Sequence, residues 1–188
     1  MSSDNGSPDV LSGERMGDHN QVVRVHAYQE IFGDKKFSGQ TEIGNIKFTF
    51  VDGFAMGIAI LLKNKTGAPS IKGYCVAADD TEDMAVKLVP INIPSCIGVF
   101  LDDDVPDGEN AWVVCYGVAY VYFWGGTTRG YFARTGVVSD SGEISGQATS
   151  GIIPPTDPFK VEKYRCEIGN VLESRTGAGL AKTILHMN

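Results

Sequence analysis

The stretch AWVVCYGVAYVYFW, residues 111–124, decides the fold class of this 188-residue chain. Val, Tyr, Trp and Phe have β-branched or aromatic side chains, which pack well on the pleated surface of a sheet. Gly117 stands near the middle of the stretch, where it predicts a bulge or a tight bend that curls a sheet towards closure. We therefore expect a bent β-strand here.

Strand patterns continue on both sides of this stretch. IKFTFV, residues 46–51, alternates apolar with polar residues, and FAMGIAILL, residues 54–62, resumes as a return strand after a short turn at Gly53. Further short strand-like segments follow, most of them closed by Gly or Pro, and no internal repeat is evident. The sequence predicts an all-β fold, a small barrel or sandwich of short antiparallel strands.

The N-terminal region differs in composition from the rest. Residues 1–45 are rich in polar and turn-forming residues, so we expect a partly extended N-terminal arm there and a β-barrel or sandwich domain over residues 46–188. Within the arm, residues 22–32 (VVRVHAYQEIF) fit a strand at first and a helical face later, and this choice stays open.

Charge and hydropathy narrow the class of partner. A net charge of −7 and a pI near 4.9 repel polyanions, so we expect no nucleic acid to bind. The densest basic cluster, Lys63, Lys65 and Lys72, is interpreted as a solvated turn. No apolar run approaches the roughly 20 residues that cross a bilayer, and the first residues do not resemble a secretory signal. We expect no membrane partner and synthesis in a host cytoplasm.

Residues capable of catalysis or metal binding do not form a known pattern. The four cysteines include no C-x-x-C pair and are interpreted as buried free thiols, although a Cys and His dyad stays open. G-x-S-x-G, H-E-x-x-H and P-loop patterns do not occur, and GGTTRG at residues 125–130 is interpreted as a hairpin tip. We therefore predict a protein that is not an enzyme and uses no cofactor and no metal.

An acidic run is the strongest alternative to that prediction. It comprises Asp102, Asp103, Asp104, Asp107 and Glu109, and clustered carboxylates hold Ca²⁺ or act as an acid and base pair. Pro106 interrupts the ligand spacing of a calcium loop, so a solvated loop is the first interpretation. A weak Ca²⁺ site and a small hydrolase remain the alternatives.

From residue 61 onward, the order of segments resembles the small β-barrel type of capsid decoration, or cement, proteins of tailed bacteriophages. The resemblance rests on short turn and strand motifs, which cover about two-thirds of the chain. They are an N-x-T-G turn with a later G-x-x-V (Asn64, Thr66, Gly67, Gly73, Val76), an I-G-V step (Ile97, Gly98, Val99), an acidic loop (Asp104, Gly108, Glu109), a G-V step (Gly117, Val118), an I-G-x-V-L-E strand in residues 167–173 and a closing strand in residues 181–186.

The resemblance implies a structural virion protein on the capsid exterior. Such a protein binds the major capsid protein and clamps neighbouring subunits against the pressure of packaged DNA, commonly as a homotrimer. The arm lies outside the resemblance, and its apolar residues are the expected capsid contacts: Val22, Val23, Val25, Tyr28, Ile31 and Phe32.

The aromatic strand leaves further choices open. Its large rings, Trp112, Tyr116, Tyr120, Tyr122 and Trp124, are interpreted as core or as an oligomer interface, with a sugar-binding platform as the alternative. If the rings bind sugar, the chain is a virion fibre, spike or tail module that binds a host receptor.

Overall fold

The computed structural model describes residues 41–52, 54–90, 95–135, 145–152 and 167–186, with only the backbone of residues 41–43 and 54–56. The chain divides into two units, Met1–Lys36 and Phe37–Asn188, and the described residues belong to the second. Every regular element among them is a strand, so the all-β prediction is confirmed. The eleven strands are β1 (Thr41–Ile43), β2 (Ile46–Val51), β3 (Phe54–Asn64), β4 (Cys75–Ala78), β5 (Ala85–Leu88), β6 (Cys96–Phe100), β7 (Asn110–Phe123), β8 (Phe132–Thr135), β9 (Ala148–Gly151), β10 (Glu167–Val171) and β11 (Gly179–His186).

Five of these strands close into a ring, which we call barrel 1. The ring runs β3–β5–β4–β6–β7 and returns to β3, because the first half of β7 pairs with both β6 and β3. Four of its pairings are antiparallel, and the pairing of β3 with β5 is parallel. A closed ring leaves no free sheet edge between its members.

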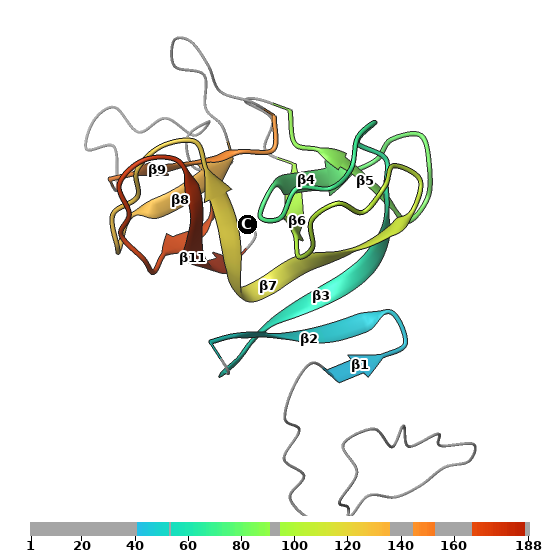
Figure 1. The fold of residues 1–188 in the computed structure, drawn as a ribbon, viewed down its shortest axis with the longest axis horizontal. Coiled ribbons are helices and arrows are strands. Elements are labelled where there is room, and N and C mark those ends of the chain that lie inside the picture. The colour runs from blue at the N-terminus through green and yellow to red at the C-terminus, as the bar shows by residue number, and fades with distance from the viewer. Residues whose placement is uncertain (1–40, 53, 91–94, 136–144, 153–166, 187–188) are drawn as a thin grey trace, which may run out of the picture. The chain divides into compact units, whose positions relative to one another are not determined.

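A second ring, barrel 2, begins with the other half of β7. It runs β7–β9–β8–β10–β11 and returns to β7, again with one parallel pairing, between β7 and β9. Figure 1 shows β7 passing from the strands of barrel 1 to those of barrel 2. A single 14-residue strand therefore belongs to both barrels.

The two barrels have the same topology. In each, the first strand in the chain pairs with the third in parallel and with the fifth in antiparallel, and the second pairs with the third and the fourth. The fourth strand carries an irregular pairing beside its glycine in both cases, Gly98 in β6 and Gly169 in β10. The repeat that we did not detect in the sequence is therefore present in the structure.

Hydrogen bonds at the turns repeat as well. Ser70 Oγ donates to Asp102 O at 2.8 Å in barrel 1, and Thr127 Oγ1 donates to Glu173 O at 2.7 Å in barrel 2. The backbone N–H of Gly73 donates to Phe100 O at 2.8 Å, and that of Gly130 to Val171 O at 2.9 Å. The matching sequence is short: K-G-Y at 72–74 with R-G-Y at 129–131, and I-G-x-x-L at 97–101 and 168–172.

The barrels share a core as well as a strand. One cluster fills barrel 1, and a second cluster fills barrel 2 and extends over the outer wall of barrel 1. On β4, for example, Val76 belongs to the first cluster, while Cys75 and Ala77 belong to the second. Because successive strand residues point to opposite faces, the outer wall of barrel 1 packs against barrel 2.

The hairpin predicted over residues 46–62 is confirmed, and it adds strands to barrel 1. β2 pairs antiparallel with β3, and β1 pairs with the outer edge of β2, with Thr41 opposite Phe48. Figure 1 shows these two strands beyond β3, away from the rest of barrel 1. Among the described residues there is no helix of the length and hydropathy that a membrane crossing requires.

Candidate functional site

The residues predicted to bind a capsid lie outside the described residues. This applies to Val22, Val23, Val25, Tyr28, Ile31 and Phe32, and also to the choice between strand and helix for residues 22–32. The chain enters the described part at Thr41, where β1 begins.

The large rings of the aromatic strand have different surroundings, although all lie on β7 or directly after it. Tyr122 packs against Tyr74 with ring centroids 5.2 Å apart, and it contacts the core of barrel 1. Trp112 packs against the shared core and lies under the ammonium group of Lys47, 5.0 Å away. Tyr116 and Trp124 are 62% and 40% exposed. Core packing therefore accounts for part of the predicted interface set, while Tyr116 and Trp124 are available to a partner.

The acidic loop connects β6 to β7 and takes part in closing barrel 1. Asp103 Oδ1 accepts a hydrogen bond from Lys72 N at 2.7 Å, and Asp107 Oδ1 accepts one from Gly67 N at 2.8 Å. Ser174 Oγ accepts the equivalent bond from Arg129 N in barrel 2, so a carboxylate is not needed at that position of the repeat. Among the described residues, no group of three or more His, Cys, Asp or Glu side chains is placed to hold a metal ion.

The basic cluster does not form a separate patch. Lys63 and Lys65 both pair with Glu82, and Lys72 lies over the ring of Tyr120 at 5.7 Å. These pairs agree with the interpretation of a solvated turn.

The thiols and histidines fall on different strands. Cys75 is buried, and both a hydrogen bond with the Cys96 thiol and burial hold the pKa of Cys75 well above its usual range. His186 Nε2 lies 2.8 Å from Asn170 Oδ1 and 3.7 Å from Glu167 Oε1 on the outer wall of barrel 2. Cys166, His19 and His26 lie outside the described residues.

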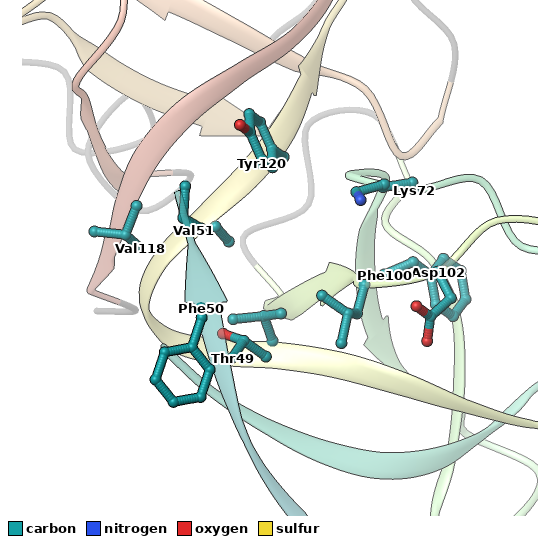
Figure 2. Close-up of a pocket in the computed structure, with 11 residues that line it drawn as sticks. Thr49, Phe50, Val51, Lys72, Phe100, Asp102, Val118 and Tyr120 are labelled. Carbon is teal, nitrogen blue, oxygen red and sulfur yellow. The ribbon is translucent and has the colours of Figure 1, made fainter. Parts of the chain in front are cut away.

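A small cavity of about 130 Å³ lies where β2, β7 and the Lys72 turn meet (Figure 2). Lys72 and Asp102 contribute the charged groups of its lining. Thr49 is 3% exposed, and its hydroxyl forms no hydrogen bond within the described part of the chain. No histidine, cysteine or pair of carboxylates is among the described residues that line the cavity.

The face of β2 that points outward is apolar. Lys47 and Thr49 are buried, at 8% and 3% exposure, whereas Ile46 and Phe48 are 45% and 38% exposed. This is the reverse of the usual arrangement, in which the apolar side of an alternating strand faces the core. Sequence analysis missed this surface, because alternation shows that Ile46 and Phe48 share a face and does not show which face is covered.

Comparisons with known proteins leave the family open. No protein-family model matches the sequence, and no curated protein matches it. Among solved structures, the chain is similar to the head fiber gp8.5 N base in bacteriophage phi29, with a TM-score of 0.46 and 14% sequence identity over 69% of this chain and 94% of that chain. A likeness at this level does not place the chain in a family.

Proposed function

We propose that this chain is a non-catalytic structural protein of a bacteriophage virion, which binds the outer surface of the capsid. It would clamp neighbouring major capsid subunits and so stabilise the head against the pressure of packaged DNA. The resemblance to capsid decoration proteins, over residues 61–188, is the basis of the proposal.

The observation that carries the proposal is where the resembling motifs lie. They fall on a turn and on the irregular strand pairings by which the two barrels close. Asn64 of the N-x-T-G turn is fully buried, and its Nδ2 donates to Ala68 O and Val105 O, both at 2.9 Å. This asparagine ties the turn to the acidic loop of the same barrel. The I-G-V and I-G-x-V-L-E motifs contain the glycines of β6 and β10, beside the irregular pairings.

Closed barrels suit a protein that coats a surface. Strands that are paired on both sides do not recruit strands from other chains, so many copies pack side by side without aggregating. Attachment through the N-terminal arm adds reach, because about 40 residues span at most roughly 130 to 140 Å when extended. Ordering the arm costs on the order of 1 to 2 kcal/mol per residue, so a homotrimer with three linked attachments holds more firmly than one copy.

Binding to heads tests the proposal directly. Phage heads assembled without this chain are mixed with the purified protein and sedimented, and bound copies are counted by quantitative mass spectrometry. Saturable binding of many copies per head is expected. Protein that stays in the supernatant at every concentration would refute capsid binding.

Exposed rings on β7 and directly after it favour a second candidate. Tyr116 and Trp124 present aromatic faces that stack on sugars, as expected of a fibre, spike or tail module that binds a host receptor. Copy number and position separate the two candidates, since a fibre or tail module is present in a few copies at a vertex or on the tail.

A further inference from the structure

β2 presents its apolar side to solvent across a continuous part of the sheet. Phe48 lies opposite Ile58 on β3, and Ile58 lies opposite Tyr116 on β7. Ile46 lies opposite Ile60 on β3, beside that row. Ile60 itself packs against the core of barrel 1. We call the other five apolar side chains on this side of the sheet the docking face: Ile46, Phe48, Phe50, Ile58 and Tyr116.

The docking face is large enough to matter for binding. Its three most exposed members are Ile46, Phe48 and Tyr116, at 45%, 38% and 62%. At about 200 Å² for a fully exposed large side chain, these three alone present roughly 300 Å² of apolar surface. Contiguous patches of this size on soluble proteins often bind a partner.

The other side of β2 is packed too closely for the strand to turn over. Lys47 lies over the ring of Trp112, and Thr49 lies against Gly57, where an added Cβ would come within 2.6 Å of Thr49 Oγ1. A shift of one residue would bring Phe48 into that space and expose Lys47. The pairing of β2 with β3 also changes register between Thr49 and Phe50, which sets the alignment of the two strands. The outward apolar face is therefore built into the sheet.

The position of the docking face relates it to the arm. β1 ends the described sheet beside Phe48, and Thr41 follows Phe32 of the proposed capsid-binding segment by nine positions in the sequence. A fully extended chain of that length spans about 30 Å. A capsid contact of Phe32 would therefore lie within about 30 Å of Thr41, at the start of β1.

We propose that the docking face is the surface by which the folded part of this chain sits on the capsid, an inference that rests on the capsid binding proposed above. The partner surface is an apolar, uncharged patch on a capsid subunit. None of the five side chains is charged, although His186 lies opposite Tyr116 on β11, so the match with such a patch is mainly one of polarity and shape.

The size of the face argues against a second copy of this chain as the occupant. A stable dimer buries about 800 Å² on each partner, well above the roughly 300 Å² of the most exposed side chains. An arm and a small face that bind the same shell reinforce each other, because the first contact raises the effective concentration of the second. In Figure 2 the ring of Phe50 points away from Lys72 and Asp102, although all three residues line the same cavity.

Binding of full-length variants to heads tests the inference. The double variant Phe48→Ser/Tyr116→Ser is compared with the single variant Tyr116→Ser and with Met84→Ser. Met84 is 65% exposed and precedes β5, so its replacement removes a similar apolar group elsewhere on the molecule. Circular dichroism and urea midpoints confirm folding. We expect the double variant to bind heads at least tenfold more weakly, Tyr116→Ser to be intermediate, and Met84→Ser to bind within twofold of the wild type.

Each contrary result has its own meaning. If the wild type does not bind heads, the proposed function fails and the inference fails with it. If the wild type binds and the double variant binds equally well, the inference alone is overturned. If light scattering shows that the double variant turns a wild-type oligomer into a monomer while binding per copy is unchanged, the occupant is a second copy, which also overturns it.

Discussion

Gly169 of β10 is the position where the barrel geometry makes its sharpest prediction. Its φ is +154°, and a Cβ there would overlap the carbonyl oxygen of Ile184 and lie 3.1 Å from Leu185 Cα. Both contacts are backbone atoms of β11, which are held by pairing with β10 on one side and β7 on the other. Because both contacts are backbone atoms, no neighbouring side chain can move to make room for the Cβ of Gly169→Ala.

The cost has two sources. A glycine-only backbone region costs on the order of 1 to 3 kcal/mol, and overpacking adds about 1 to 3 kcal/mol. We expect Gly169→Ala to lower the free energy of unfolding by about 3 to 5 kcal/mol, a large part of the 5 to 15 kcal/mol typical of a domain. Urea denaturation followed by Trp112 and Trp124 fluorescence measures it.

Two matched variants show whether the reasoning holds. Gly98 is the equivalent residue of barrel 1, where a Cβ would lie 2.5 Å from Val114 O without the positive φ, so Gly98→Ala should cost about 1 to 3 kcal/mol. Gly125 has open space around it, so Gly125→Ala should change stability by less than about 0.5 kcal/mol. A Gly169→Ala protein as stable as Gly125→Ala would refute the barrel 2 geometry.

The remaining predictions concern the shared core, the turn, one carboxyl group and the acidic loop. Because the barrels share β7 and one core cluster, urea unfolding should show one transition by fluorescence and by circular dichroism, and two separated transitions would contradict the shared core. Replacing the fully buried Asn64 by Ala removes its hydrogen bonds to Ala68 O and Val105 O, so it should cost about 1 to 3 kcal/mol, against less than about 0.5 kcal/mol for the exposed Asn110→Ala. Burial raises the pKa of Glu167, and the charges of His186 and Arg134 oppose the rise. The folded protein thus keeps this proton to higher pH than the unfolded chain, so the free energy of unfolding should fall as pH rises from the usual range of a glutamate through the raised pKa. Glu167→Gln should remove that fall, and a variant with the pH profile of the wild type would contradict the role of Glu167. Changing Asp102, Asp103 and Asp104 together to Asn should leave binding to heads unchanged, whereas loss of turnover of some substrate would support the hydrolase alternative.

The fold class was readable from the sequence because it depends on local chemistry. Residues 111–124 have the composition of a packed strand, and the predicted bend is present: Gly117 has a φ of +84°, and the pairing with β3 shifts beside it. Alternation and a glycine turn likewise signalled the hairpin of β2 and β3. Each of these signals lies within a few residues.

The two barrels could not be predicted from the sequence, because the closure of each depends on a few pairings between residues far apart in the chain. Two residue pairs join β3 to β5, and one pair, Phe123 with Ala148, joins β7 to β9. The repeat was hidden for a related reason. Backbone contacts require glycine at positions 98 and 169, but the core tolerates different side chains of suitable volume, so Phe100 and Val171 occupy equivalent places.

The candidate site was only partly accessible to sequence analysis. Tyr116 was singled out as a large ring on the aromatic strand, and its 62% exposure agrees with a role in binding. Ile46 and Phe48 were treated as one half of an alternating strand. Which side of that strand is covered depends on how Lys47 and Thr49 pack against β3 and β7, which no local pattern encodes.

Imaging intact phage particles at a resolution that traces this chain tests the central claim most directly. The account predicts many copies on the outside of the head, each with Phe48 and Tyr116 turned towards capsid subunits. Particles that carry the chain only on the tail or at a single vertex, or that lack it altogether, would contradict the account.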